Sequence, residues 1–150
     1  PDAVIHPEAA EEEHMTGALL TYALAAAACT AALAVARLAM GGAGESFALS
    51  TALSFAFFFA VGGLAWRFGG AIVKGSVFVR SLAVWGVVAL AVALIDLAPR
   101  MAGRSLGNAG DVLMINLPVF FGAWLAVALI WGGVFKLRAP DPVQTTEIAS

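Results

Sequence analysis

The stretch VFVRSLAVWGVVALAVALIDLA, residues 77–98, decides the class of fold, because its interior from residue 81 to residue 95 carries no charged side chain. A helix of ~20 predominantly apolar residues is long enough to cross the hydrocarbon core of a bilayer. Pro99 follows directly, and proline removes a backbone donor and disfavours helix in the residue before it. We therefore predict a transmembrane helix over about 77–98, ending before Pro99.

Three further stretches of the same kind flank this one, separated from it by breaks that contain Gly, Ser and Arg. They run over about 16–40, 47–68 and 111–135. Asp111 would cap the last of these helices, because a carboxylate there accepts free backbone N–H groups and complements the helix dipole. The sequence thus predicts an all-α membrane protein, a bundle of four transmembrane helices.

The overall composition excludes an ordinary soluble domain. Of the 150 residues, 61% are hydrophobic and 12% are charged, and the mean hydropathy is +0.92. Soluble domains carry about a quarter charged residues, and one of this size would leave the excess apolar surface exposed to water. The net charge is −2, with no basic cluster of the kind that neutralises phosphates. We expect the lipid bilayer as a partner and no nucleic acid.

The chain divides into three parts. Residues 1–15 form an acidic N-terminal tail, residues 16–138 form the transmembrane domain, and residues 139–150 form a polar, proline-broken tail that we predict to be disordered. The acidic N-terminal stretch lacks the basic residues and the apolar core of a signal peptide, so we expect the first helix to act as its own insertion signal.

The placement of charge predicts that both termini are cytoplasmic. Lys and Arg are more numerous at the cytoplasmic ends of membrane spans, and here five lie on the side of the termini and three on the other. Trp66, Trp85 and Trp131 lie near span ends on the more basic side, where indole rings commonly anchor at the headgroup layer. We predict these three as interface anchors. The five basic residues are Arg67, Lys74, Arg80, Lys136 and Arg138, and the three are Arg37, Arg100 and Arg104.

Asp96 is the most informative polar position, because an ionisable residue near the hydrocarbon is costly and is usually paired or functional. Arg100 lies one helical turn further along, and Arg37 lies at a comparable depth on the first span. A pair between Arg37 and Asp96 would hold the first and third spans together. The alternative is a proton or ion relay, so these residues form a candidate intramembrane ion pair or polar site.

Asn116 and Pro118 lie early in the fourth predicted span. An amide can bond a neighbouring helix, and a proline frees a carbonyl one turn back. Such a break either lines a substrate cavity or is a kink that packing tolerates. On the first span, Ala28, Ala32 and Ala36 recur at four-residue spacing, which lets helix backbones approach closely.

The residue types that membrane enzymes use are missing from the predicted spans. His6 and His14 precede the first span, so no histidine within the membrane would hold a haem or a metal. Cys29 alone cannot supply the paired-cysteine chemistry of membrane thiol oxidoreductases. No nucleophile has a neighbouring base, and the glycines lack phosphate-cradling spacing. We expect no enzyme activity, no catalytic residue, no metal and no cofactor.

The segment WRFGGAIVKGSVFVRSL, residues 66–82, resembles the loop between helices two and three in the DUF2975 family of bacterial four-helix membrane proteins. In that family a lysine-glycine pair, a small residue and a phenylalanine lead into the third span, as KGSVF does at residues 74–78. The segment GVFK, residues 133–136, resembles the family's closing segment, although the acidic end that follows it there is missing. The resemblance implies a four-helix topology and an accessory or regulatory role in the membrane.

These features predict a non-catalytic accessory or regulatory subunit in the bacterial inner (cytoplasmic) membrane, packed against other membrane subunits or against itself as a homo-oligomer. The alternative is a small oligomeric transporter or channel with a polar path near Asp96, Arg37 and Asn116. A transporter needs a polar cavity that reaches past mid-membrane. An accessory subunit needs an apolar surface that a partner covers.

Overall fold

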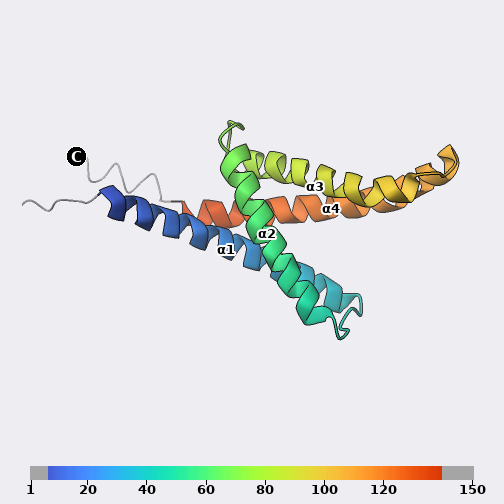
Figure 1. Ribbon diagram of the computed structural model, residues 1–150, viewed down its shortest axis with the longest axis horizontal. Helices are drawn as coiled ribbons and strands as arrows, with labels where there is room; N and C mark the ends of the chain where they lie inside the picture. The colour runs from blue at the N-terminus through green and yellow to red at the C-terminus, as the bar shows by residue number, and fades with distance from the viewer. Residues whose placement is uncertain (1–6, 140–150) are drawn as a thin grey trace, which may run out of the picture.

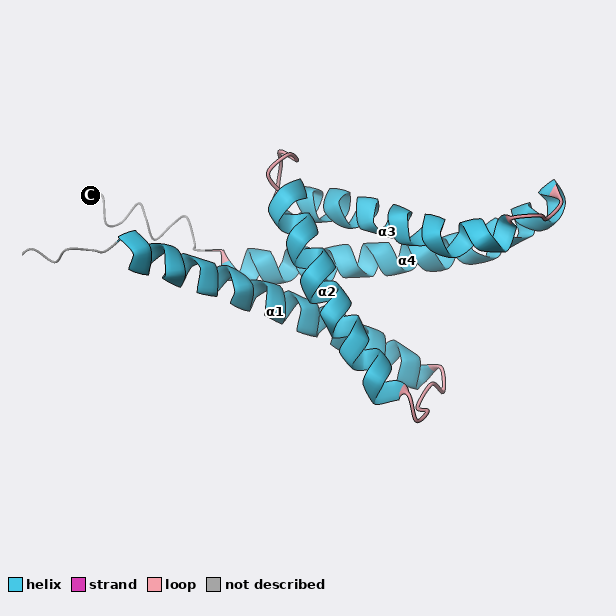
Figure 2. Cartoon of the chain, viewed as in Figure 1, coloured by secondary structure: helices cyan, strands magenta, loops and turns pink. Residues whose placement is uncertain are grey.

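The computed structural model describes residues 7–139, and these residues form four α-helices joined by short connections (Figures 1 and 2). All four are long and apolar enough to cross a membrane, which confirms the predicted all-α membrane protein with four transmembrane helices. The predicted disordered tail over 139–150 lies outside the described residues, apart from Ala139. The helices are α1 (Pro7–Ala39), α2 (Phe47–Gly69), α3 (Val77–Met101) and α4 (Leu106–Arg138).

Helix α1 begins well before the predicted residue 16. Its first residue is Pro7, whose missing N–H costs nothing in the first turn of a helix. The acidic residues from Glu8 to Glu13 follow, and negative charge near a helix N-terminus complements the helix dipole. The described part of the acidic tail is therefore continuous with the first membrane-spanning helix.

Two predicted helix ends are wrong. Helix α3 continues through Pro99 to Met101, because a proline in the last turn removes only one backbone hydrogen bond, and Ala102 N–H still reaches the carbonyl of Ala98. Helix α4 begins at Leu106, not at Asp111, and the preceding residue Ser105 caps it by accepting from the N–H of Asn108 at 3.5 Å.

The helices form two hairpins, α1 with α2 and α3 with α4. Helices α1 and α4 also pack against each other, and among the four pairs of helices whose backbones come close, α2 and α3 have the smallest contact. The hairpins separate toward the connections 40–46 and 102–105, which we call the open end (Figure 1). The opposite end, formed by the start of α1, the connection 70–76 and the end of α4, we call the basic end. Both described chain ends lie there, and its cytoplasmic orientation remains a prediction.

The core lies where the four helices meet. The ring of Trp131 is fully buried and lies 5.2 Å from the ring of Trp85, edge to face. Phe58 meets Trp85 at 5.8 Å, and Phe135 lies 5.6 Å from Trp131. Gly62 makes room for both indoles, because a Cβ there would lie 2.7 Å from Trp131 and 2.8 Å from Trp85. Contacts between aromatic rings thus hold α2 against α3 and α4, and Gly62 lets the helices come close enough for these contacts to form.

Two side-chain hydrogen bonds join α3 to α4. The buried hydroxyl of Ser81 donates to the carbonyl oxygen of Ala128 at 2.6 Å. Nearer the open end, the indole Nε1 of Trp124 donates to the carbonyl oxygen of Leu82 at 2.9 Å. Polar side chains that bond across helices satisfy groups which lipid cannot. These bonds make α3 and α4 the most closely joined pair.

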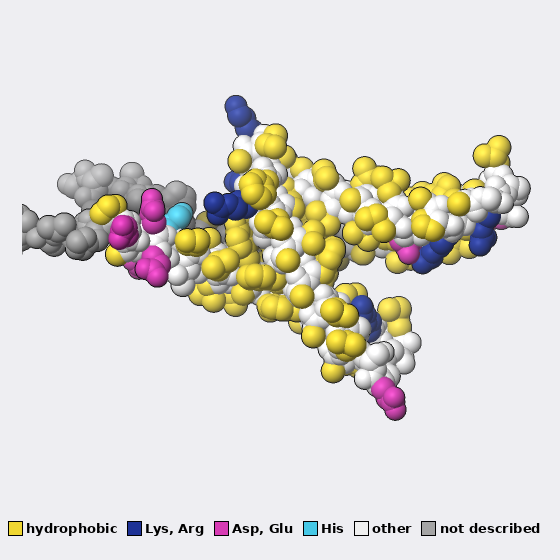
Figure 3. All heavy atoms as spheres, viewed as in Figure 1, with side chains coloured by type: hydrophobic (Ala, Val, Ile, Leu, Met, Phe, Trp, Pro, Cys, Tyr) yellow, Lys and Arg dark blue, Asp and Glu magenta, His cyan; other side chains and the backbone are white. Residues whose placement is uncertain are grey.

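Apolar side chains cover most of the molecular surface, and the charged side chains gather toward the ends of the helices (Figure 3). Large exposed residues occur on every helix, such as Val35 on α1, Leu53 on α2, Val87 on α3 and Val119 on α4. In water such a surface would aggregate, whereas in a bilayer it faces acyl chains. The chain is therefore a multi-pass integral membrane protein.

Candidate functional site

Of the four predicted polar residues, the structure brings only Asp96 and Arg100 together. Asp96 pairs with Arg100 at 2.9 Å within α3, and both side chains are substantially exposed. Arg37 donates from Nη1 to the hydroxyl of Ser50 on α2, also at 2.9 Å. The Nδ2 of Asn116 donates to the carbonyl of Val112 in its own helix at 2.7 Å. Each group is satisfied within its own hairpin, and none of these side chains lines either cavity described below.

The prediction that Trp66, Trp85 and Trp131 anchor at the headgroup layer is wrong. Their exposed fractions are 8%, 3% and 0%, so the rings belong to the protein interior. Trp85 and Trp131 fill the space beside Gly62. Trp66 is covered by Phe135, 4.6 Å away, and by the guanidinium of Arg80, 5.1 Å from its ring centroid. Closeness to a span end places an indole at the right depth but does not decide which way its ring points.

An apolar cavity of about 370 Å³ lies between the two hairpins, and we call it the hairpin cleft. All four helices contribute to its wall, and none of the lining side chains is charged. Small residues form part of the wall on α1 and on α4. The lining residues are Cys29, Ala32, Leu33 and Ala36 on α1, Phe57 and Phe58 on α2, Trp85, Val88, Ala89 and Val92 on α3, and Phe120, Ala123, Trp124, Ala126, Val127 and Ile130 on α4.

The few polar side-chain atoms around the hairpin cleft are mostly engaged within the protein. Trp124 Nε1 bonds Leu82, and the thiol of Cys29 lies 4.0 Å from the carbonyl oxygen of Val127. Within the described chain, Trp85 Nε1 is buried and has no hydrogen-bond partner. The chemistry of the hairpin cleft is therefore apolar contact, with no group placed for acid–base or nucleophilic work.

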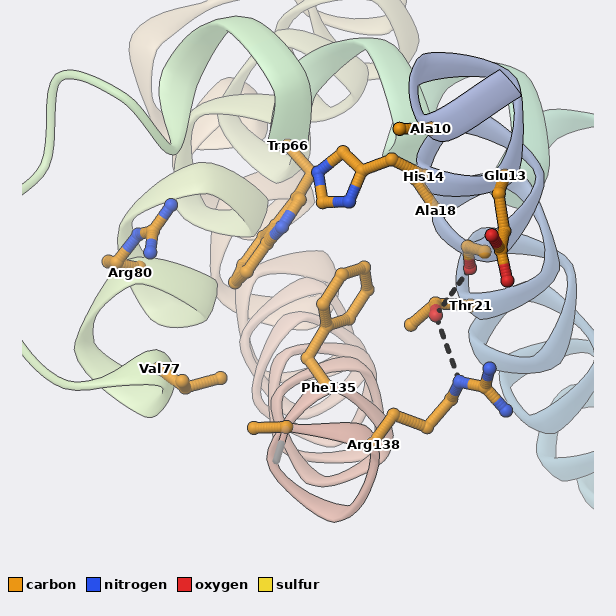
Figure 4. Close-up of a pocket in the computed structure, with 12 residues that line it drawn as sticks. Ala10, Glu13, His14, Ala18, Thr21, Trp66, Val77, Arg80, Phe135 and Arg138 are labelled. Atoms are coloured by element: carbon orange, nitrogen blue, oxygen red, sulfur yellow. Dashed lines mark hydrogen bonds between the residues drawn. The ribbon is translucent and has the colours of Figure 1, made fainter. Parts of the chain in front are cut away.

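A second cavity, of about 670 Å³, lies at the basic end, and we call it the basic pocket (Figure 4). Thr21 and His14 come from α1, Trp66 from α2, Arg80 from α3 and Arg138 from α4. In the sequence, the two arginines indicate only the orientation of the chain. Both arginines lie near span ends in the sequence, but they line a common pocket, from opposite sides of Trp66 and Phe135, only because α1 extends beyond its predicted span (Figure 4).

Metal binding finds no support in the side chains of residues 7–139, which contain no group of three or more His, Cys, Asp or Glu placed to hold a metal ion. Cys29, the one cysteine of the sequence, is buried among apolar residues.

Comparison with known proteins adds no relative to these observations. No family model, curated protein or solved structure matches this chain. The resemblance to the DUF2975 family therefore stays a prediction, and the fold and the two cavities carry the functional argument.

Proposed function

We propose that this chain is a non-catalytic accessory or regulatory subunit of the bacterial inner membrane, and that the hairpin cleft receives an apolar transmembrane helix of another membrane subunit. The observation that carries the proposal is the cleft itself: an uncharged cavity lined by all four membrane-spanning helices. A cavity of this kind inside a bilayer does not fill with water. It takes up either acyl chains or the side chains of a neighbouring helix.

The small residues of the cleft support a helix as the occupant. Ala32 and Ala36 lie one turn apart on α1, and Ala123 and Ala126 lie one turn apart on α4. Small residues at such spacing let helix backbones approach closely, which is how helices associate where lipid removes the hydrophobic driving force. The four alanines are exposed in the isolated chain, so a partner can reach them.

A second copy would fill the cleft either by reciprocal insertion in a two-fold dimer or by head-to-tail insertion in a ring or open chain. We assign the cleft to a helix of a different membrane protein, with one occupant per cleft, and the experiment below distinguishes the two occupants.

The contacts of the polar residues argue against the transport alternative. Arg37 bonds within the α1–α2 hairpin, whereas Asp96 and Asn116 each bond within their own helix of the α3–α4 hairpin. A polar path would need the three side chains to line one cavity. The hairpin cleft offers an ion or polar solute no charged side chain.

The test is extraction of the chain from native membranes in mild detergent, followed by size analysis and mass spectrometry of what travels with it. The cleft variant is the double substitution Ala32→Leu and Ala36→Leu, which fills the groove. The control is Ala27→Leu and Ala31→Leu, at exposed positions of α1 that do not line the hairpin cleft. Both doubles add the same apolar volume to the same helix.

The proposal predicts a different membrane protein at fixed stoichiometry with the wild type and with the control, and its loss from the cleft variant. If both double variants retained the partner protein equally, the partner would bind outside the cleft. A wild-type chain that travels only with copies of itself would contradict the accessory role and favour transport.

A further inference from the structure

A third cavity, of about 840 Å³, lies between α1 and α2 near the basic end, and we call it the α1–α2 groove. Its walls run along α1 from Ala10 to Tyr22 and along α2 from Phe59 to Arg67. On each helix the lining residues recur at intervals of about four residues, so they form a single face of that helix. Two helix faces thus border one groove that runs along the helices.

The α1–α2 groove has the length of one leaflet. From Ala10 to Tyr22, α1 rises by about 18 Å. Half of the hydrocarbon core of a bilayer is ~15 Å thick. Tyr22 and Phe59 form the deep end of the groove, and a Cβ at Gly63 would lie 3.5 Å from the ring of Tyr22, so the two helices touch there. The groove therefore matches the length of one phospholipid molecule.

The deep end of the groove is held in shape by the core. The Tyr22 ring stacks on Trp131, with the ring centroids 6.3 Å apart, and lies 5.7 Å from the ring of Phe135. Small side chains on both helices, Ala18 and Ala60, leave the space between the walls open. A ligand that enters the groove therefore meets a preformed apolar surface.

The mouth of the groove differs from the hairpin cleft, because it carries charged side chains. Glu11 and Arg67 both lie there and are exposed. Neither takes part in an ion pair within the described chain, where Asp96 and Arg100 form the only one. With His14 counted as neutral, the mouth has no net charge. An apolar wall with a polar mouth fits an amphiphile, and an arginine at the headgroup level fits its phosphate.

We propose that the α1–α2 groove binds one phospholipid with a zwitterionic headgroup, whose acyl chain lies between the two helices and whose phosphate accepts from Arg67. A hollow with an apolar wall does not fill with water inside a bilayer, whereas acyl chains are available there in every membrane. Because the mouth carries no net charge, an anionic headgroup gains no general attraction to it. The site does not rest on the proposed accessory role.

The test uses the full chain, delipidated in an uncharged detergent, with native mass spectrometry to count the molecules of added phosphatidylethanolamine that bind. One molecule should bind, in a saturable way. Diacylglycerol with the same acyl chains lacks the phosphate and should bind about tenfold more weakly, the effect of losing a charge-assisted hydrogen bond. Equal binding of these two lipids would overturn the phosphate contact, and tighter binding of phosphatidylglycerol would overturn the assignment to a zwitterionic headgroup.

Ala60→Leu tests the groove itself, because the larger side chain fills the space between its walls. It should weaken phosphatidylethanolamine binding by about tenfold or more, since the acyl chain and the leucine compete for one volume. Ala56→Leu is the matched control: it adds the same volume at an exposed position one turn earlier on α2, which lines none of the three cavities. Equal binding by the two variants would overturn the groove as the site, and a dimer lost only in Ala60→Leu would assign the groove to a second copy.

Arg67→Gln should weaken phosphatidylethanolamine binding by about tenfold and leave diacylglycerol binding unchanged, because only the phosphate contact is removed. Lys74→Gln removes the same charge from an exposed position at the basic end, outside the groove, and should bind both lipids like the wild type. A loss in Lys74→Gln as large as that in Arg67→Gln would overturn the site and leave only a general attraction of lipid to the basic end. Thermal unfolding without lipid is measured first for each variant, and the comparison of the two lipids on the wild type tests the site even if a variant does not fold.

Discussion

Gly62 is the residue on which the packing of the core depends most closely. Its hydrogen faces two buried indoles, and no Cβ fits between them without movement of Trp85 or Trp131. Both rings are held by further aromatic neighbours, so a shift at one propagates to the others. Small-to-large substitutions in such cores cost about 1–3 kcal/mol.

We therefore expect Gly62→Ala to lower the free energy of unfolding by about 1–3 kcal/mol, measured by denaturant titration in detergent. Gly133→Ala is the matched control, because a Cβ at Gly133 meets nothing within 4 Å. The control should leave stability unchanged or raise it slightly, since alanine is the better helix former. A Gly62→Ala protein as stable as the control would contradict this account of the core.

The Asp96–Arg100 pair could be predicted from the sequence, whereas the direction of the Trp85 ring could not. Because Asp96 and Arg100 are four residues apart on one predicted helix, an ion pair between them could be predicted from the sequence. The structure places their side chains 2.9 Å apart. The direction of the Trp85 ring could not be read. It depends on Gly62, a residue of another helix and distant in the sequence. Local spacing predicts contacts within a helix, whereas contacts between helices need their relative placement.

At the scale of elements, apolar length predicted the membrane spans, but signals at the helix ends were ambiguous. Ser105 and Asp111 are both good capping residues, and the choice between them depends on how many polar residues the helix takes up before entering lipid. The structure extends α4 to Leu106, so Asp111 lies within the helix. Similarly, Pro99 sits inside the last turn of α3 and does not end it.

The position of the cap can be measured. Ser105→Ala should lower the free energy of unfolding by about 0.5–1 kcal/mol, because the N–H of Asn108 loses its acceptor. Asp111→Ala should cost less, since that side chain caps nothing in the structure. Paired denaturant titrations in detergent compare the two variants. The larger loss in Asp111→Ala would place the start of α4 where the sequence alone predicted it.

At the scale of the whole molecule, function depends on how two hairpins are set against each other. Their separation opens the hairpin cleft, and the extension of α1 toward the end of α4 closes the basic pocket. Some residues of both cavities were noted from the sequence: alanines at four-residue spacing, and arginines near span ends. The cavities themselves could not be predicted, because each is lined by residues from all four helices.

The most direct test of the central claim is photo-crosslinking in native membranes from a photoreactive residue at position 36, within the hairpin cleft, compared with position 31, on an exposed part of α1 that does not line the cleft. A helix seated in the cleft predicts a crosslink to a different membrane protein from position 36 and only lipid adducts from position 31. Lipid adducts alone from position 36, or crosslinks only to a second copy of this chain, would contradict it.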